Sequence, residues 1–399
     1  MTTHPPVARP DTVRRHNLSQ VLGQVHRDGE LTRSALTQRL HLSRSTIGAL
    51  VSELTELGLI DERVPTGGGG AGRPSHVVGP RDDGPYAVAV DIDITHVRTA
   101  AIGIGGRVLA RHEVATDPAP SPPGSIAKHV VSAVEQLNEQ VPPGAWPIGI
   151  GVSVPGTVSR FSGKVEFAPN LNWRHEAFGE ILGAAAPEGL AVSIGNDANL
   201  AALTEHLRGN ARGADDVIYL MGRIGVGAGI LVNGRPLGGH DGHAGEVGHN
   251  VVDVSGPHCH CGKRGCVETY IGDNALLELA GRSAVPTTDN VAAVFTDAAN
   301  GDDDAAKAIR TVAEALGRTI ASLVNILNPE RVVLGGSLAY VHAFASEEIV
   351  GSLQRYGMGT TRNKVDLCVS AFTEDGSLLG AAELAFVPIL ADPTTARRG

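Results

Sequence analysis

The densest group of chemically capable side chains lies in the segment HNVVDVSGPHCHCGKRGCVE, residues 249–268. One imidazole and three sulfurs follow one another there with the spacing H-x9-C-x-C-x4-C, and Gly262 and Gly265 allow the chain to fold tightly around an ion. Four soft or borderline ligands with no obvious open position fit a structural, tetrahedral Zn²⁺. The predicted metal ligands are His249, Cys259, Cys261 and Cys266.

A disulfide is the competing interpretation of these cysteines. Cys259 and Cys261 are too close in sequence to pair easily, three cysteines leave one over, and a reducing cytosol disfavours disulfides. Zinc is therefore the preferred interpretation. The interleaved His258 and His260 are expected on the loop surface rather than on the metal.

Two carboxylates flank the predicted metal loop. Glu246 precedes His249 by three residues, and Glu268 follows Cys266 by two, so a bound metal would hold both carboxylates over one small space. Together with the amide of Asn196 and the carboxylate of Asp197, they offer the acceptors and donors that neighbouring sugar hydroxyls need. Taken one at a time, each is more typical of ordinary surface or of a helix cap.

The first eighty residues predict a different kind of module. Leu18, Val21, Leu22 and Val25 are spaced as one face of a helix that Asp28-Gly29 ends. Thr32 and Ser43 are predicted to cap two further helices, with a tight turn at His41-Leu42 between them. The expected inward residues are Ala35, Leu36 and Leu40 in the first of these helices, and Ile47, Leu50, Val51 and Leu54 in the second.

Two short helices joined by a brief turn match the helix-turn-helix pattern, and residues 57–60 with 64–79 resemble the strands and wing of a winged version. The second helix would enter the major groove of DNA, with Gly-Arg-Pro at 72–74 reaching into a minor groove. A small helical bundle for protein interaction is the alternative. The predicted DNA-contacting residues are Arg33, Ser43, Arg44, Ser45, Thr46 and Arg73.

The rest of the chain reads as two α/β repeats. Residues 86–116 predict three strands with hairpin turns, followed by a helix at 125–140, a buried strand at 148–158 and a strand-to-helix step at 190–203. A second series follows, with strands within 217–234, 331–339 and 365–372, long helices within 274–327, and a closing helix at 377–386. The predicted fold class is α/β: a winged helix-turn-helix, then an actin-like, sugar-kinase-like two-domain body with an interdomain cleft.

Seven motifs in order give this body a specific resemblance. They are SVPGTV (153–158), APNLNW (168–173), GNDAN (195–199), GRIGVGAGI (222–230), HAGEVGH (243–249), CHCGKRGCVE (259–268) and LGGS (334–337). The chain resembles the ROK family of repressors, open reading frames and sugar kinases, in its regulator branch, from about residue 13 to 386. The resemblance implies zinc on the same His and three Cys, sugar contacts from Asn196, Asp197, Glu246, His249 and Glu268, and a pocket-lining place for Asn172.

The resemblance also raises the question of catalysis. In the family's kinases the residue matching Asp197 is the base in phosphoryl transfer, which requires two glycine-rich phosphate loops. The first of these loops reads DIDIT here, with Asp93 where a glycine is expected, and the second carries Arg223 and Ile224 in place of a small hydroxyl residue and a glycine. A glycine lets backbone N–H groups approach phosphate closely, so both loops are predicted to be degenerate and Asp197 a vestigial base.

Charge and composition support this division of the chain. Residues 1–81 carry ten Arg and seven Asp or Glu, a net +3, whereas the whole chain is −10, which leaves −13 for the body. No apolar run is long enough for a membrane span and no secretory signal is evident, so a cytoplasmic protein is expected. The predicted domains are 1–80, 85–200 with the closing helix 377–390 expected to return to it, and 201–376, which carries the zinc loop.

These patterns predict a sugar-responsive transcriptional regulator, most simply a repressor, that binds palindromic operator DNA as a homodimer or homotetramer. The effector would close the cleft and shift the DNA-binding heads between two states. Two alternatives remain open. One is an ATP-dependent sugar kinase with an appended DNA-binding domain, and the other is a regulator that ignores sugars and uses the body only for dimerisation.

Overall fold

The computed structural model describes residues 10–64, 75–94, 96–116, 121–283, 285–360 and 364–396. The chain divides into two compact units. The first consists of Met1–Val152, Phe178–Ile194 and Ala381–Gly399, and the second of Ser153–Ala177 and Gly195–Gly380. The N-terminal head therefore belongs to the same unit as the first sheet of the body.

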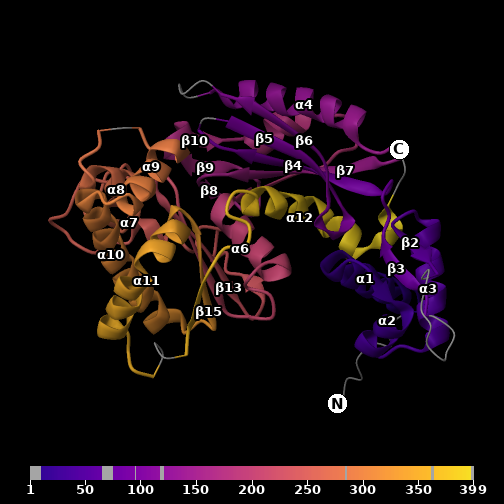
Figure 1. The fold of residues 1–399 in the computed structure, drawn as a ribbon. Coiled ribbons are helices and arrows are strands. Elements are labelled where there is room, and N and C mark those ends of the chain that lie inside the picture. The colour runs from indigo at the N-terminus through magenta and orange to yellow at the C-terminus, as the bar shows by residue number, and fades with distance from the viewer. Residues whose placement is uncertain are drawn as a thin grey trace, which may run out of the picture. The chain divides into compact units, whose positions relative to one another are not determined.

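The head is a winged helix in the order helix, strand, helix, helix, strand, strand (Figure 1). Its three short strands form an antiparallel sheet in the order β1-β3-β2. The predicted caps are confirmed, since Thr32 accepts a hydrogen bond from the amide of Ala35 and Ser43 from that of Thr46. The elements are α1 (Pro10–Asp28), β1 (Leu31–Thr32), α2 (Arg33–Leu40), α3 (Arg44–Glu56), β2 (Ile60–Arg63) and β3 (Val77–Pro80).

Most of the predicted apolar face of the head is buried, with one exception. The four inward residues of α1 and the four of α3 are at most 5% exposed. In α2 only Leu36 is buried, whereas Ala35 and Leu40 are half-buried, so full burial is found for one of the three predicted inward residues. A helix of eight residues has little more than two turns, so few of its residues can be fully covered by the rest of the head.

The turn between α2 and α3 holds a residue in an unfavourable conformation. His41 has a φ of 53°, in the left-handed region that costs an L-residue about 1–2 kcal/mol. His41→Gly is therefore expected to stabilise the protein by roughly 0.5–1 kcal/mol, because glycine also ends helices well at this position. Urea unfolding followed by far-UV circular dichroism measures the difference. Gln38→Gly, in the exposed interior of α2, should instead destabilise by about 1 kcal/mol, and a loss of the same size for His41→Gly would contradict the prediction.

The first unit also contains a five-stranded sheet in the order β11-β7-β4-β5-β6. Every residue of its central strand β4 is buried, which explains the apolar run at residues 86–90. Its strands are β4 (Pro85–Ile92), β5 (His96–Gly103), β6 (Val108–Ala115), β7 (Trp146–Val154) and β11 (Val192–Asn196). Its helices are α4 (Pro123–Gln140), α5 (Phe178–Ala185) and the C-terminal part of α12 (Gly376–Ala391), with a short turn η1 (Ile104–Gly106) after β5.

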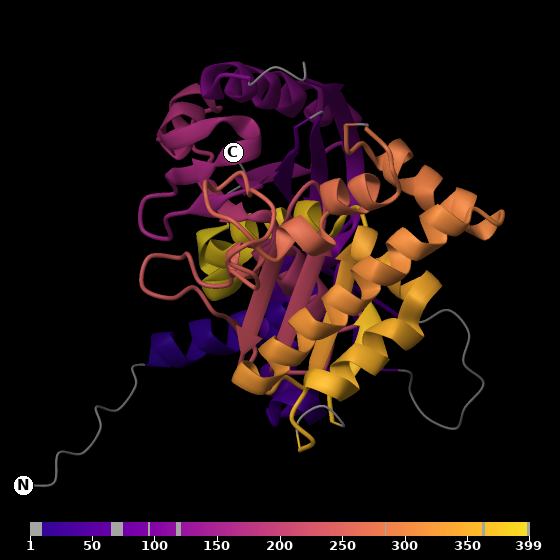
Figure 2. The same ribbon diagram turned by 90° about the vertical axis from the view of Figure 1, so that its left-hand side faces the viewer.

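The second unit repeats the theme with a five-stranded sheet in the order β14-β13-β12-β15-β16. β15 runs parallel to both of its neighbours, and α10 and α11 lie side by side in both views of the ribbon (Figures 1 and 2). Its strands are β12 (Val217–Gly222), β13 (Val226–Val232), β14 (Arg235–Pro236), β15 (Arg331–Gly336) and β16 (Asp366–Val369). Its helices are α6 (Asp197–Arg208), α7 (Glu268–Ile271), α8 (Asp273–Leu279), α9 (Thr288–Ala299), α10 (Asp303–Leu327) and α11 (Ser337–Tyr356), with a short turn η3 (Val247–His249).

A further small sheet in this unit did not emerge from the sequence. Three strands of two to four residues pair antiparallel in the order β10-β9-β8, and a short turn, η2 (Pro169–Leu171), connects two of them. The strands are β8 (Thr157–Val158), β9 (Val165–Ala168) and β10 (Trp173–Glu176). Such short strands carry too few alternating residues to be recognised from periodicity alone.

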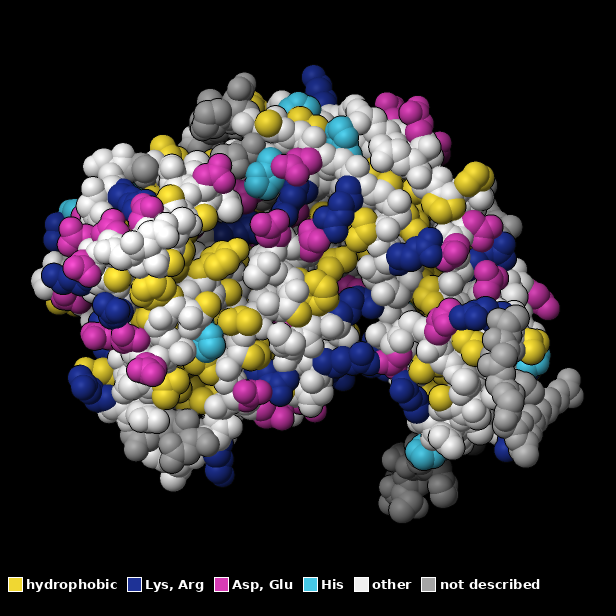
Figure 3. Space-filling view, in the orientation of Figure 1, with side chains coloured by type: hydrophobic (Ala, Val, Ile, Leu, Met, Phe, Trp, Pro, Cys, Tyr) yellow, Lys and Arg dark blue, Asp and Glu magenta, His cyan; other side chains and the backbone are white. Residues whose placement is uncertain are grey.

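Among the described residues, no helix is long and apolar enough to cross a membrane. On the face shown in Figure 3, acidic and basic side chains are intermixed and form no extended patch of one sign. Charges are also intermixed in the head, because several of its arginines pair with acidic residues of the head itself. These pairs are Arg14 with Glu53, Arg33 with Glu62, Arg39 with Asp28, and Arg63 with Glu30.

Candidate functional site

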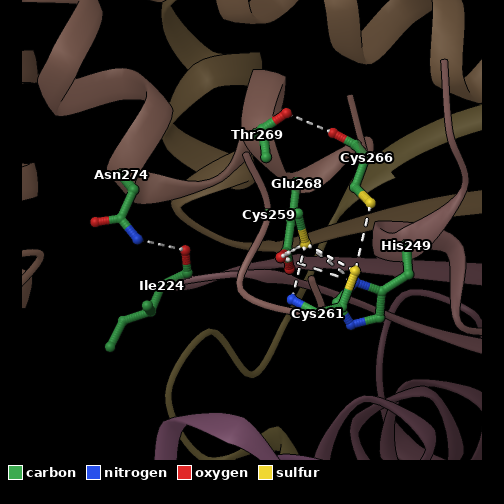
Figure 4. A network of polar contacts seen from close by, with 8 residues as sticks. All are labelled: Ile224, His249, Cys259, Cys261, Cys266, Glu268, Thr269 and Asn274. Atoms are coloured by element: carbon green, nitrogen blue, oxygen red, sulfur yellow. Dashed lines mark hydrogen bonds and ion pairs between the residues drawn. The ribbon is translucent and has the colours of Figure 1, made fainter. Parts of the chain in front are cut away.

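The four predicted metal ligands lie together in the second unit. The ligand atoms of His249, Cys259, Cys261 and Cys266 all lie within 4.8 Å of one another (Figure 4). Cys259 Sγ lies 3.7 Å from His249 Nδ1, and Cys261 Sγ lies 3.7 Å from Cys266 Sγ. All four cysteines of the chain are free thiols, so no disulfide competes for these sulfurs.

The separations of the ligand atoms are close to those around a bound metal ion. A tetrahedral centre with bonds of about 2.3 Å to sulfur and 2.0 Å to nitrogen places its ligand atoms about 3.5–3.8 Å apart. Two of the separations above fall in that range, and the third, 3.2 Å between Cys259 Sγ and Cys261 Sγ, needs only a small opening. The cluster therefore fits a four-coordinate metal ion.

Backbone contacts explain how this loop brings distant ligands together. An antiparallel bridge between Val251 and Cys266 closes the loop at its base, and Val267 donates its N–H to Asn250 O at 2.9 Å. A tight turn follows Cys259, whose N–H donates to Lys263 O at 2.9 Å. These backbone contacts thus hold the three cysteine sulfurs close to one another.

Glu268 lies directly beside the cluster, at the start of α7. Cys259 Sγ donates a hydrogen bond to Glu268 Oε1 at 2.8 Å, and the same oxygen lies 3.7 Å from His249 Nδ1 (Figure 4). Burial and this hydrogen bond raise the pKa of the Cys259 thiol. The other oxygen, Oε2, faces the β12–β13 turn, where a side chain on Gly225 would come within 2.7 Å of it.

The second flanking carboxylate belongs to Glu246, just before η3. It keeps solvent access, yet desolvation by the surrounding atoms raises its pKa, and the charge of Glu268 acts in the same direction. His249 and His243 oppose this shift. His249 and Glu268 therefore lie close enough to Glu246 for their charges to affect its pKa.

Asn196 and Asp197 lie at the N-terminus of α6. The Asn196 side chain caps the helix by accepting from Asn199 N at 3.0 Å, and its Nδ2 donates to Gly156 O and to Asp197 Oδ1, also at 3.0 Å. Asp197 is only 7% exposed. The Asn196 amide therefore already serves as a helix cap and as a link to the loop after β7.

The glycines of β13 have a packing role that is separate from any phosphate. A side chain on Gly229 would lie 2.4 Å from Ala198 O, and one on Gly227 would lie 2.9 Å from Ala198 Cβ, because α6 rests directly on this strand. Together with Gly225 they let α6 and Glu268 approach the same short stretch of backbone from two sides. Glycine at positions 227 and 229 is thus required by the packing of α6 on this strand.

Asn172 lies apart from the cluster, on the small sheet. It has a φ of 55° at the end of η2 and lines a cavity of about 350 Å³. A neighbouring cavity of about 540 Å³ reaches Cys261 of the metal cluster. Sequence reasoning missed the other residues that line these two cavities, which include Arg174, His175, His243 and His260. Their only sequence signal is their position beside or within the matched motifs.

The two loops predicted to be degenerate phosphate loops are occupied by internal contacts. In the first, Asp91 is fully buried and pairs with Arg98 at 2.6 Å, while Asp93 Oδ1 accepts from Ile94 N at 2.5 Å. In the second, Arg223 O accepts from Asp273 N at 3.0 Å. Burial raises the pKa of Asp273 to about 6.

The predicted DNA contacts were located on the head. Ser43, Ser45 and Thr46 lie at the first turn of α3, where Ser43 Oγ is 2.8 Å from both other hydroxyls. Arg44 is exposed beside them, and no ion pair of its guanidinium is found within the described part of the chain. Arg33 instead pairs with Glu62 of β2. Arg73 lies outside the described residues.

Comparisons with known proteins agree with both halves of this description. The ROK family model matches residues 87–387, and the MarR family model matches residues 19–70. The xylose repressor of Bacillus subtilis is 25% identical over 381 residues, covering 93% of this chain and 95% of that protein. The transcriptional dual regulator NagC of Escherichia coli is 29% identical over 346 residues, covering 82% of each chain.

Solved structures match over the same regions. A ROK family transcriptional regulator described as a homologue of the E. coli MLC protein superimposes with a TM-score of 0.76 at 24% identity, covering 95% of this chain and 97% of that one. A ROK family glucokinase from Streptomyces griseus gives 0.63 at 28% identity, covering 75% of this chain and 98% of the kinase. The chain carries a MarR-type winged helix ahead of a sugar-kinase-like body, and it belongs to the ROK family.

Proposed function

We propose that this protein is a DNA-binding transcriptional regulator, acting as a repressor, whose ROK body binds a sugar. The observation that carries the proposal is the union of a winged helix with a ROK body. Relatives matched over more than four-fifths of the chain are named xylose repressor and N-acetylglucosamine repressor. Control of carbohydrate genes follows from this combination.

The head would read operator DNA with α3. Its first turn presents Arg44 with the hydroxyls of Ser45 and Thr46, a set suited to base edges and phosphates. Arg33, held by Glu62, would need to leave that ion pair before it contacted DNA. A homodimer or homotetramer would place two copies of α3 in successive major grooves of a palindromic site, which light scattering and footprinting can test.

The metal of the His and three Cys cluster is proposed to be zinc in a structural role. Zinc supplies a rigid cross-link among four side chains that are otherwise held by a short loop. A metal-bound thiolate has no proton to donate, so Cys259 would no longer hydrogen-bond Glu268. The carboxylate of Glu268 would then need another donor, and a sugar hydroxyl is one.

The sugar would lie among Glu246, His249 and Glu268, with Asn196, Asp197 and Asn172 as further contacts. Carboxylate oxygens beside an imidazole provide the mixed acceptors and donors that vicinal hydroxyls require. The Asn196 amide also caps α6, so a sugar bound to it would contact a side chain that the fold already orients.

Removing the charge of Glu268 should therefore weaken sugar binding. Glu268→Gln is expected to lower affinity about tenfold or more, since hydrogen bonds to charged groups contribute about 1.5–3 kcal/mol. Calorimetric titration of the zinc-loaded protein with D-xylose and N-acetyl-D-glucosamine, free and phosphorylated, measures the change. Glu278→Gln, which changes an exposed side chain of α8, is the control, and equal affinities for the two variants would remove Glu268 from the pocket.

A sugar kinase is the second candidate, because ROK kinases share the body fold. Two features argue against a kinase. Asp91 and Asp93 make internal contacts in the first phosphate loop, and the second loop carries the side chain of Arg223. We infer that the protein is not an enzyme. An ATP-dependent phosphorylation assay over a sugar panel decides, and robust turnover would reverse this inference. If no sugar raises the melting temperature of the zinc-loaded protein, a sugar-independent regulator becomes the better description.

A further inference from the structure

Helix α12 is the one described helix whose two ends belong to different units. Residues Gly376–Gly380 belong to the second unit, and the residues from Ala381 onward belong to the first. Pro388 lies near the C-terminal end of α12, and the helix is continuous from Gly376 to Glu383, so a displacement at one end of this part is carried to the other.

At its N-terminal end, α12 is packed backbone to backbone against α6. A side chain on Gly380 would lie 2.2 Å from Leu200 O, so only glycine allows this approach. Thr204 Oγ1 adds a buried hydrogen bond to Gly376 O at 2.7 Å. α6 begins at Asp197, one of the proposed sugar-binding residues. These contacts therefore connect α12 to the helix whose N-terminus lies at the proposed sugar site.

At its other end, α12 is attached to the DNA-binding head by a buried polar contact. His26, near the end of α1, and Glu383 of α12 lie 2.8 Å apart, Nε2 to Oε2, and are 1% and 6% exposed. Figure 1 shows this part of α12 beside α1. The His26 ring also packs on Phe386 with centroids 4.9 Å apart.

The second ring nitrogen of His26 fixes the direction of this hydrogen bond. Gly105 N, in the turn after β5, donates to His26 Nδ1 at 3.2 Å, so Nδ1 is an acceptor. The proton of the neutral imidazole therefore lies on Nε2, which donates to the Glu383 carboxylate. One side chain of the head thus contacts both the turn after β5 and α12.

We propose that α12 couples the second unit to the DNA-binding head, and that the hydrogen bond between His26 and Glu383 is its point of attachment. The proposal deepens the proposed function by naming the route of regulation. A buried charge-assisted contact suits this role, because it is directional and has few alternative partners once water is excluded. His26 and Glu383 are then positioning residues that act through α1.

A double-mutant cycle in the full-length, zinc-loaded protein tests the coupling without any sugar. Thr204→Val removes the hydroxyl that holds Gly376 O while preserving shape. The matched control is Thr319→Val, which removes another buried threonine hydroxyl, bonded only to Ala315 O within α10. The same substitutions are then made in a double variant, His26→Phe with Glu383→Met, that lacks the hydrogen bond between these two residues. Both partners are replaced by apolar groups of similar size, so neither is left buried without the other.

Two readouts are used, so that failure of DNA binding does not end the test. The first is affinity for a DNA duplex that the wild-type protein selects from a random library, and the second is amide hydrogen exchange of α1 in the DNA-free protein. Thr204→Val is expected to change both by about fivefold or more in the wild-type background. In the double-variant background it should change neither, whereas Glu383→Gln, which keeps an acceptor for His26, should retain the effect.

Equal responses of Thr204→Val in the two backgrounds would overturn the attachment through His26 and Glu383. Equal responses of Thr204→Val and Thr319→Val would overturn the role of α12, because the effect would then reflect general destabilisation. If the wild-type protein selects no DNA, the proposed function of the head fails, and the exchange measurements still decide the coupling.

Discussion

Replacing Cys266 with alanine is expected to remove one bound zinc ion per chain and to lower the unfolding temperature by about 10 °C. Cys266 is fully buried, and its backbone forms a bridge to Val251 at the base of the loop. Because this backbone is held in place, no other group can easily move in to replace the lost sulfur. A metal present at a thousand times its Kd contributes about 4 kcal/mol, and each kcal/mol corresponds to about 2–4 °C in a domain of this size. Metal analysis and thermal unfolding measure the two effects.

Cys368→Ala is the matched control for this experiment. Cys368 lies on β16, outside the cluster, and its replacement should leave the metal content at one ion per chain. Wild-type protein stripped by a chelator should unfold within about 3 °C of Cys266→Ala, because both have lost the same cross-link. A Cys266→Ala variant that retains a full equivalent of zinc would show that the cluster is not the metal site.

The metal ligands could be predicted from sequence because they share one short loop. The spacing of Cys259, Cys261 and Cys266 nearly fixes where the sulfurs can lie, and only His249 had to be brought in from ten residues away. The caps at Thr32 and Ser43 were predictable for the same reason, since a cap contacts an amide three residues ahead. Local rules are sufficient where the partners are local.

Contacts between distant segments could not be predicted in this way. His26 and Glu383 are separated by 357 residues, and nothing in the sequence around His26 distinguishes it from a surface histidine at a helix end. The hydrogen bond from Asn196 Nδ2 to Gly156 O and the packing role of Gly229 were hidden likewise, because each depends on which backbone lies opposite. Motif matching found these positions but did not indicate these contacts.

Replacing Arg44 with alanine is expected to lower operator affinity by about tenfold to a hundredfold, which corresponds to about 1–3 kcal/mol. Arg44 projects from the first turn of α3 and is exposed, so it loses little intramolecular contact when DNA binds. Arg14, Arg39 and Arg63 are each engaged with a carboxylate of the head and would have to give up that partner. The head's net charge of +3 therefore overstates the charge that is free to meet phosphate.

Fluorescence anisotropy at several salt concentrations separates the two roles that Arg44 can have. If it contacts phosphate, the variant should weaken binding to all sequences and reduce the slope of log K against log salt by about 1. If it reads a base, discrimination at one operator position should fall while the slope changes less. Arg355→Ala, an exposed arginine at the end of α11 in the second unit, is the control and should leave both quantities unchanged. Unchanged affinity for Arg44→Ala would contradict recognition by Arg44 of α3. DNA would then have to contact another surface of the head, because the arginines of α2 and β2 are already paired with carboxylates.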